Sequence, residues 1–274
     1  MLRPMRLTSL LLPVGLAALL LPSLLLPGCG EPAPAGGILE RIRARGALVV
    51  ATEAEFPPFE SVEGGQIVGF DVDLVRAVAD DLGVRLELRN VSFKSIIDEL
   101  TSGKVDLIAS GMTVTDERAR TVLFSDVYFT TITCLLVSTA RRGDVRSVED
   151  LDRPDRTVAV KEGTTGEVAA KKRLTKAHIV SHEAENTAAM DVAEGRADAF
   201  LYDLSSVTQH QQRNPERTFL IEAPVTHEPY AMACRLSDAA LKQRVDAVLA
   251  RLRTEGRLAA LLAKHGLREP GGPR

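Results

Sequence analysis

The sequence lacks the residue spacings that are typical of metal centres and of redox-active thiols. Its five histidines form no HExxH pair, and its three cysteines form no CxxC. Because no ligand spacing is present, we expect neither a metal ion nor another cofactor. We interpret the histidines as surface residues; they are His178, His182, His210, His227 and His265.

An excess of positive charge is also missing. The chain has 34 Lys and Arg against 37 Asp and Glu, a formal net charge of −3. Without residues 1–28, which include Arg3 and Arg6 but no acid, 32 basic residues face 37 acidic ones, and the net charge is −5. Nucleic-acid-binding surfaces carry clustered positive charge. This balance argues against nucleic acid as a partner.

A third missing feature is an apolar run of membrane-spanning length without proline. The apolar stretch after Arg6 is interrupted by Pro13 and Pro22, and no acidic residue precedes Glu31. Such a segment is typical of an export signal and not of a spanning helix. Its end, LPGC, resembles the lipobox of bacterial lipoproteins, with Cys29 as the lipid acceptor.

We therefore predict a lipoprotein signal peptide at residues 1–28, followed by a linker at residues 29–45 that begins with the stretch GEPAPAGG after Cys29. The protein would then be exported and lipid-anchored to a membrane, in the periplasm or at the cell surface.

What the sequence does contain is a globular composition. In 274 residues, 45% are hydrophobic and 26% charged, which is enough for two domains with sizeable cores. From Gly46, strand patterns such as LVVAT alternate with helical patterns such as VDLVRAVADDL, which stops at Gly83. This succession predicts an α/β fold with a mostly parallel sheet covered by helices.

The alternation is complete once by about residue 125 and restarts near residue 157, after the β-rich stretch FSDVYFTTITCLLVST. We therefore predict two α/β lobes. The last segment, from Tyr230, has the pattern of a strand and two helices. The residues alone allow it either to cap the second lobe or to return to the first.

Ligands of open parallel sheets bind beyond the carboxyl ends of the strands, and four such ends carry distinctive residues. One continues into GMTVTDERAR, where Gly111 permits a tight turn, Thr115 caps a new helix and Arg118 lies in its first turn. N–H groups, hydroxyls and a guanidinium would together hold a small anion. The alternative for this segment alone is a capped helix with a solvated arginine.

The other three strand ends also have two interpretations each. Phe56 and Phe59, which flank a Pro-Pro pair, line a cleft or belong to the core. TTGE, shortly after Lys161, is a capping box with or without ligand-binding backbone, and Lys161 alone would be a surface residue. Asp203 either receives a cation or caps the next helix.

The blocks PPFE, VGFDVDL, GMTVTDER, FSDVYF, GTTGE and GRADAFLYD, in this order, make residues 46–266 resemble the periplasmic amino-acid-binding proteins of ABC importers. The resemblance implies a type II periplasmic-binding-protein fold, with two lobes joined by two hinge strands near residues 129–133 and 227–230. The ligand would lie in the cleft between the lobes. Lobe 1 would comprise residues 46–130 and 230–274, and lobe 2 residues 131–229.

The resemblance also implies a role for each site residue. Arg118 would bind the α-carboxylate of the ligand, supported by Thr113 and by backbone N–H groups near Gly111 and Thr165. Asp203 would bind the α-ammonium group. The residues that would surround the ligand side chain are Phe56, Phe93, Glu53 and Lys161.

Glu53 and Lys161 would meet the far end of that side chain. Because like charges repel strongly in a dry site, Glu53 disfavours a carboxylate there and Lys161 disfavours a cation. A neutral amide suits both, and in the related glutamine receptors an acid, more commonly the shorter aspartate, and a lysine stand at these positions. We therefore expect glutamine, with arginine or another basic amino acid as the alternative if Lys161 turns to solvent.

The resemblance implies a monomeric receptor, not an enzyme, that delivers a free polar L-amino acid to the membrane subunits of an ABC permease. Two alternatives stay open. The same fold hosts a dehydratase acting on prephenate or arogenate, for which Glu53 or Glu167 would be the general acid. A sensory module that docks on a signalling receptor is the second alternative.

Cys134 and Cys234 are the cysteines that remain after Cys29, in an exported and oxidising setting. Both lie in segments that form or flank the expected hinge, so a disulfide between them is one option. Two buried small apolar side chains are the other.

Overall fold

The computed structural model describes residues 37–268. The predicted signal peptide, the lipid acceptor Cys29 and the first part of the predicted linker lie outside these described residues. Within the predicted linker, however, Ile38–Arg45 form helix α1. Ile38 and Ile42, one helical turn apart, are both buried in the core, and this packing explains the helix.

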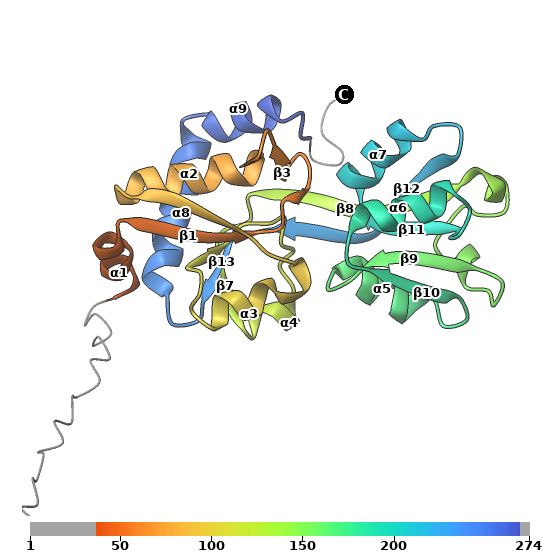
Figure 1. The fold of residues 1–274 in the computed structure, drawn as a ribbon, viewed down its shortest axis with the longest axis horizontal. Coiled ribbons are helices and arrows are strands. Elements are labelled where there is room, and N and C mark those ends of the chain that lie inside the picture. Colours follow the sequence, from red (N-terminus) through yellow and green to blue (C-terminus); the bar gives the residue numbers. More distant parts are fainter. Residues whose placement is uncertain (1–36, 269–274) are drawn as a thin grey trace, which may run out of the picture. The chain divides into compact units, whose positions relative to one another are not determined.

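Lobe 1 is built on a five-stranded sheet with the order β5-β1-β6-β13-β7 (Figure 1). β1 (Ala47–Thr52) pairs in parallel with β5 (Arg85–Asn90) and β6 (Leu107–Ile108). β13 (Ala233–Arg235) pairs antiparallel with β6 and with β7 (Val122–Phe124). The C-terminal segment thus returns to lobe 1, which settles the choice that the residues alone left open.

The other elements of lobe 1 surround this sheet or extend it. A small antiparallel sheet consists of β2 (Glu55–Phe56), β3 (Glu60–Glu63) and β4 (Gln66–Val68). The helices are α2 (Phe70–Leu82), η1 (Phe93–Ser95), α3 (Ile96–Thr101), α4 (Asp116–Ala119), α8 (Ala239–Thr254) and α9 (Arg257–Lys264).

Lobe 2 repeats the architecture with a sheet of order β10-β9-β11-β8-β12. β9 (Thr157–Lys161) pairs in parallel with β10 (His178–His182) and β11 (Ala199–Asp203), while β8 (Phe129–Ser138) runs antiparallel to β11 and to β12 (Thr218–Tyr230). The helices are α5 (Thr165–Arg173), α6 (Glu185–Ala193) and α7 (Leu204–Arg213), with short 3₁₀ turns η2 (Thr139–Arg141) and η3 (Glu149–Leu151). Both lobes are α/β with mixed sheets.

Two antiparallel strands, β8 and β12, run between the lobes (Figure 1). At their lobe 1 ends, Phe129 pairs with Tyr230 and Thr133 with Thr226. A single bridge from Thr113 to Tyr230 joins this ribbon to lobe 1. The crossing points therefore lie where the resemblance places the hinge.

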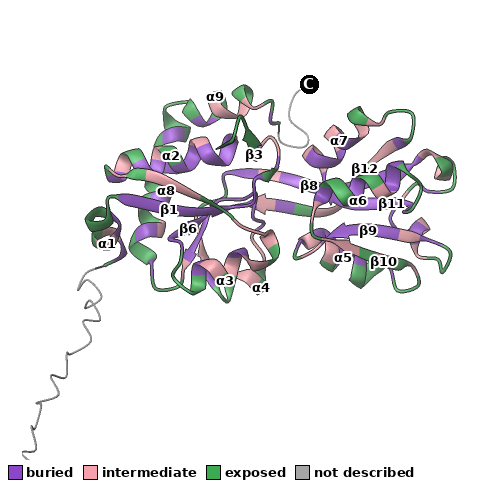
Figure 2. Cartoon of the chain, viewed as in Figure 1, coloured by how far each residue is buried: buried purple, intermediate pink, exposed green. Residues whose placement is uncertain are grey.

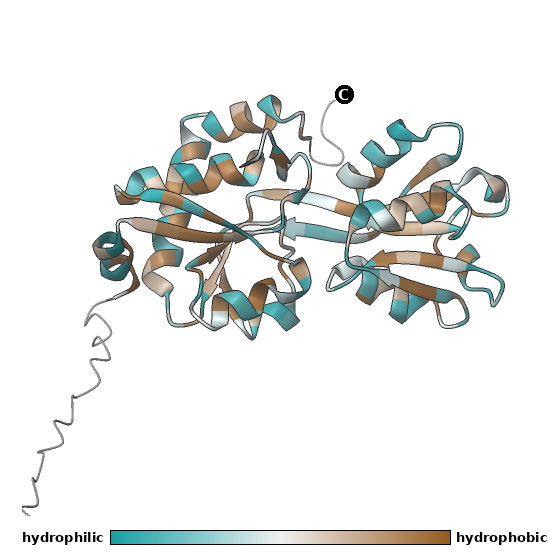
Figure 3. Cartoon of the chain, viewed as in Figure 1, coloured by the Kyte–Doolittle hydropathy of each residue, from teal (hydrophilic) through white to brown (hydrophobic). Residues whose placement is uncertain are grey.

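Helix α2 shows how the sequence pattern produces one of these elements. Val72, Val75, Val78 and Leu82 recur with the helical period, and all four are buried. Fully burying one such side chain contributes about 1.5–3 kcal/mol. Gly83 ends the helix with φ 71°, a left-handed conformation that glycine adopts without a Cβ clash. Figures 2 and 3 show the same division elsewhere, with buried hydrophobic strands and exposed polar helix faces.

The predicted surface position is wrong for one histidine. His178 and His227 are exposed, and His182 and His265 are half-buried. His210, in contrast, is only 5% exposed. Its Nε2 lies 3.4 Å from Oε1 of the buried Glu185, because α7 packs against α6 and brings the ring inside.

The two described cysteines are buried free thiols. Cys134 in β8 and Cys234 in β13 both belong to the main hydrophobic cluster, so the apolar interpretation holds and the disulfide does not. Burial raises the pKa of the Cys134 thiol to about 12 and that of Cys234 to about 11. Both therefore remain protonated at neutral pH.

Within residues 37–268, no helix combines the length and the apolar character that crossing a membrane requires.

Candidate functional site

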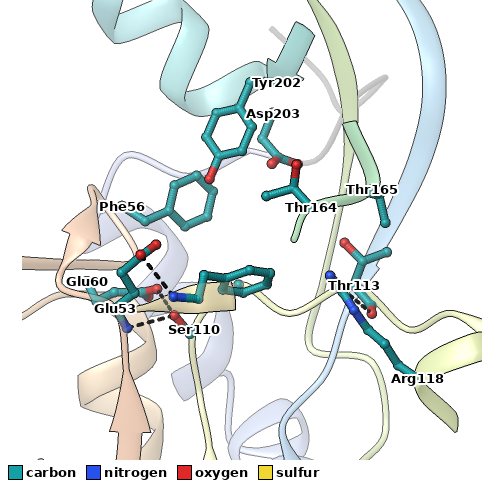
Figure 4. A pocket seen from close by; sticks show the side chains of 12 residues that line it. Glu53, Phe56, Glu60, Ser110, Thr113, Arg118, Thr164, Thr165, Tyr202 and Asp203 are labelled. Atoms are coloured by element: carbon teal, nitrogen blue, oxygen red, sulfur yellow. Dashed lines mark hydrogen bonds between the residues drawn. The ribbon is translucent and has the colours of Figure 1, made fainter. Parts of the chain in front are cut away.

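A polar pocket lies between the two lobes. It contains eight of the nine site residues expected from the sequence; Lys161 is the ninth, and it lies directly behind Glu53. Figure 4 shows Glu53, Glu60 and Ser110 at one end, and Thr113, Thr165 and Arg118 at the other. The lining residues are Glu53, Phe56, Glu60, Phe93, Ser110, Gly111, Thr113, Arg118, Thr164, Thr165, Tyr202 and Asp203.

Arg118 is held by its own turn and by lobe 2. Thr115 caps helix α4 by accepting the Arg118 N–H at 3.1 Å, as predicted. The guanidinium donates to the carbonyls of Thr113 (2.9 Å) and Gly163 (3.0 Å). Its carbon lies 5.2 Å from the ring centroid of Phe93, a cation–π contact. Two of its five N–H donors are used in these bonds, so others can reach a ligand anion.

The N–H of Gly111 itself is hydrogen-bonded within the protein. It donates to Oδ2 of Asp71 at 2.8 Å, and the hydroxyl of Tyr128 donates to the same oxygen at 2.6 Å. Gly111 has φ 50°, and an added Cβ would lie 2.5 Å from the Phe56 ring. The glycine is therefore required by the turn and by the ring beside it.

Asp203 ends β11 and precedes α7, yet its side chain forms no cap hydrogen bond to that helix. Instead, its Oδ1 accepts the hydroxyl of Tyr230 at 2.7 Å. Burial, and then the charge of Glu228, raise the pKa of Asp203 to about 8. Of its two interpretations, the helix cap is therefore wrong, and the carboxyl group is available to a cation in the pocket.

Glu53 and Lys161 form an ion pair across the lobes. Glu53 follows β1 of lobe 1, and Lys161 ends β9 of lobe 2. The lysine side chain is 1% exposed, so its interpretation as a surface residue is wrong. Oε1 of Glu53 also accepts the N–H of Phe93 at 3.0 Å. Glu53 lines one end of the pocket, and Lys161 lies behind it.

Glu60 and Ser110 are pocket residues that the sequence interpretation missed. The Ser110 hydroxyl donates to Oε1 of Glu60 at 2.7 Å and accepts the N–H of Glu53 at 2.9 Å. Burial and the nearby Asp71 hold the pKa of Glu60 well above its usual range. Burial likewise raises the pKa of Asp71 to about 6. A signal was present, since Glu60 ends the block PPFE and Ser110 ends DLIAS.

The two phenylalanines around the Pro-Pro pair occupy different environments. Phe56 lines the pocket, whereas Phe59 is fully buried and stacks behind it, with ring centroids 5.0 Å apart. Phe56 also meets Tyr202 edge-on at 5.8 Å. The cleft interpretation thus fits Phe56 alone, because the turn points the second ring into lobe 1.

TTGE is both a capping box and a pocket wall. The hydroxyl of Thr164 accepts the N–H of Glu167 at 3.3 Å, and Oε2 of Glu167 accepts the N–H of Gly163 at 2.8 Å. Thr164 and Thr165 line the pocket, but Glu167 does not. Its other oxygen pairs with Lys171 on the outer side of α5.

The family model for bacterial extracellular solute-binding proteins, family 3, matches residues 48–268. A probable histidine-binding protein of Neisseria gonorrhoeae is 30% identical over 227 residues, which cover 81% of this chain and 84% of that protein. From Bacillus subtilis, the arginine-binding extracellular protein ArtP is 32% identical (79% and 85% covered) and the ABC transporter glutamine-binding protein GlnH is 30% identical (76% and 76%).

Among solved structures, the ancestral amino-acid-binding protein AncCDT-1, described as a precursor of cyclohexadienyl dehydratase, superposes with a TM-score of 0.78. It is 38% identical, and the match covers 84% of this chain and 99% of that one.

Proposed function

This chain belongs to family 3 of the bacterial extracellular solute-binding proteins, and from that premise we propose that it captures a free polar L-amino acid and delivers it to an ABC permease. In this proposal the protein is a monomeric receptor and not an enzyme. It reaches the permease from the outer side of the membrane, where a lipid on Cys29 anchors it.

One observation carries the proposal: a guanidinium and a carboxyl group reach the same pocket from opposite lobes. Arg118 belongs to lobe 1 and Asp203 to lobe 2, and both line the pocket. An amino acid carries two opposite charges, and each must be paired when water is removed. Arg118 would take the α-carboxylate and Asp203 the α-ammonium group.

Because Arg118 and Asp203 belong to different lobes, ligand binding would favour closure of the two lobes. A ligand that contacts Arg118 alone gains as much in an open arrangement as in a closed one. Asp203 becomes its partner only when lobe 2 approaches, so the ligand stabilises the closed arrangement by its differential contacts. The permease would then distinguish loaded from unloaded receptor by the position of the lobes.

For the ligand side chain we favour glutamine, because of the Glu53–Lys161 pair. The two charges offset each other, so a charged side chain would leave this end of the pocket with an uncompensated charge. Among the described residues, the buried Nζ of Lys161 has no hydrogen bond of normal geometry beyond its contact with Glu53. A side-chain amide would give that ammonium group a carbonyl and give Glu53 an N–H donor.

A basic amino acid is the second candidate, and Glu60 is the observation that favours it. Glu60 adds a second carboxyl group to the end of the pocket that holds Glu53. If a guanidinium entered between them, its charge would stabilise the ionised form of Glu60, whose pKa is raised by burial. Lys161 would then have to leave its buried position, which is the cost of this alternative.

Neither of the two general acids expected for the dehydratase alternative offers an unpaired carboxyl group to the pocket. Glu167 does not line the pocket, and Glu53 is paired with Lys161. Glu60, whose pKa burial raises well above its usual range, is the acid that remains for such chemistry. A sensory module would bind its ligand in the same pocket but would dock on a signalling receptor instead of a permease.

The first test is a thermal-shift screen of residues 37–268 with the common L-amino acids and with prephenate. We expect a shift that grows with the logarithm of ligand concentration above the dissociation constant. Turnover of prephenate without a shift from any amino acid would reject the receptor proposal.

The second test separates glutamine from arginine by calorimetric titration. We expect the wild type to prefer glutamine, and Lys161→Ala to lose at least about tenfold of its glutamine affinity, since a hydrogen bond to a charged group is removed. Lys176→Ala, an exposed lysine in the same lobe, is the control. A wild type that prefers arginine, or an unchanged glutamine affinity in Lys161→Ala, would show that the pair does not read an amide.

A further inference from the structure

Glu228 is a buried carboxylate on hinge strand β12 that does not line the polar pocket itself. It lines an adjoining pocket together with Thr113, Arg118 and Thr165. One of its oxygens, Oε2, accepts two hydroxyls, that of Thr113 at 2.5 Å and that of Thr165 at 2.7 Å. Thr113 belongs to lobe 1, and Thr165 opens helix α5 of lobe 2. A single carboxylate oxygen therefore joins a residue of each lobe at the hinge.

The other oxygen of Glu228 is held by the hinge itself. Oε1 accepts the hydroxyl of Thr226 on the same strand. The hydroxyl of Thr226 lies 2.6 Å from that of Thr133 on β8. Because Thr226 donates its proton to Glu228, Thr133 is the donor in this contact. The carboxylate is thus fixed by both hinge strands.

The hydrogen bonds to Glu228 use the hydroxyl protons of two threonines that line the pocket. A threonine hydroxyl has one proton, and an ionised carboxylate only accepts. While Thr113 and Thr165 donate to Glu228, neither hydroxyl has a proton left for the α-carboxylate of a ligand. The Thr113 hydroxyl is therefore unavailable to the ligand carboxylate in this arrangement.

Arg118 lies within the field of the same carboxylate. Partial burial lowers the pKa of the guanidinium, and the charge of Glu228 is the largest influence in the opposite direction. Of the residues expected around the ligand carboxylate, Glu228 thus accepts hydrogen bonds from Thr113 and Thr165 and interacts electrostatically with Arg118.

We propose that Glu228 is a positioning residue of the α-carboxylate subsite: it engages the hydroxyl protons of Thr113 and Thr165 and ties the two lobes at the hinge. The ligand carboxylate is then received by Arg118 and backbone N–H groups, and the two threonines act through Glu228. This inference rests on the proposed function where it concerns the ligand. The bridge between the lobes does not depend on any ligand.

The bridge is tested first, without ligand, by a thermal-unfolding cycle on the full chain. Thr165→Val should lower Tm by about 2–4 °C in the wild type, and by less than half of that in Glu228→Gln, which already lacks the charged acceptor. Thr113→Val should behave in the same way. Equal losses of Tm in both backgrounds would overturn the bridge, whether or not the protein binds an amino acid.

The subsite role is tested by titrating the same variants with L-glutamine and, as a second probe, L-arginine. Thr113→Val and Thr165→Val should each lower the affinity for the probe that binds by about tenfold in the wild type, but less than about twofold in Glu228→Gln. A merely structural residue would not produce this coupling in affinity. Full losses in both backgrounds would mean that the hydroxyls contact the ligand directly, and would overturn the positioning role.

Two further variants keep the test decisive. Glu222→Gln removes an exposed carboxylate from the same strand and should leave both Tm and affinity near the wild-type values. Thr165→Ser keeps the hydroxyl, so it should retain the affinity that Thr165→Val loses. If Glu228→Gln does not fold, the Ser and Val pair at positions 113 and 165 still decides whether the hydroxyls matter, and equal affinities within each pair would overturn the proposal.

Discussion

The two lobes contribute unequally to the pocket that they share. Lobe 1 supplies eight of the twelve lining residues, among them Arg118, Phe56 and Phe93, and lobe 2 supplies four. An amino acid could therefore make most of its contacts on lobe 1 alone. Lobe 2 adds Asp203, the acceptor that a zwitterion still needs. For the proposed receptor, we therefore infer an order of events in which lobe 1 receives the ligand and lobe 2 then closes over it.

The two faces also differ in charge. Lobe 1 presents Glu53 and Glu60 at one end of the pocket and Arg118 at the other, whereas lobe 2 presents Asp203 and, behind the pocket wall, Lys161. At the Glu53 end of the pocket, lobe 1 thus supplies the acidic group and lobe 2 supplies the basic one. Cross-lobe contacts such as the bond from Gln209 to the carbonyl of Pro57 (2.9 Å) add to the ion pair. The proposed closure would therefore pair charges as well as bury the ligand.

Removing the guanidinium of lobe 1 should have the largest effect. We expect Arg118→Ala to lose about 2–5 kcal/mol of binding free energy for the bound amino acid, because a desolvated carboxylate loses its cation. Circular dichroism should show an intact fold. Arg120→Ala, two residues away and exposed, is the control for calorimetry. Near-wild-type affinity in Arg118→Ala would remove Arg118 from the site.

Neutralising the acceptor of lobe 2 should cost less. Asp203→Asn keeps the shape of the side chain and one hydrogen bond, so we expect a loss of about 2–3 kcal/mol. The on-rate should change little if the ligand first meets lobe 1, and the off-rate should carry the loss. Stopped-flow kinetics would separate the two rates. A loss confined to the on-rate would contradict the proposed order of events.

Asp203 should also make ligand binding and stability depend on pH. Its pKa is about 8 in the folded chain, against about 3.9 when unfolded. Its contribution to ligand-free stability is therefore full below about pH 4 and is lost as pH rises to about 8. An ammonium ligand requires the ionised form, so binding at pH 7 should release close to one proton. Calorimetry in two buffers of different ionisation enthalpy measures this release, and Asp203→Asn should abolish it.

The aromatic support of Arg118 should have the smallest effect. Phe93→Leu removes the ring below the guanidinium, and we expect a loss of about 0.5–1 kcal/mol in affinity. Phe219 in lobe 2 forms a matched pair with Arg142 at 4.7 Å, away from the pocket. Phe219→Leu should leave affinity unchanged in the same titration. Equal losses in both variants would point to general destabilisation instead.

Much of the fold and of the site could be predicted from local patterns. Helical periodicity and Gly83 delimit α2, and Thr115 and Arg118 form the predicted cap. These predictions succeeded because each depends on residues within a few positions of one another. The errors concern burial. Phe59, Lys161 and His210 are buried by elements distant in the chain, and no local pattern reports such packing.

The chemistry of the pocket likewise depends on tertiary packing that local sequence patterns do not predict. Glu60, Ser110 and Asp71 come from three separate segments, and the raised pKa values of Glu60 and Asp71 arise from a burial that only the fold creates. Gly111 was predicted as a turn residue, correctly, but its N–H is used by Asp71. A backbone group can be located from the sequence, whereas its partner cannot.

The sequence by itself determined the α/β elements, their order in two lobes and the residue types at the strand ends, because propensity, periodicity and capping act over short distances. Tertiary structure alone decided which of these residues meet. Glu228 and Thr113 are 115 residues apart, and Lys161 and Glu53 lie in different lobes. Their contacts exist because two hinge strands return the chain to the same place, where a low-dielectric interior makes each charge require a partner.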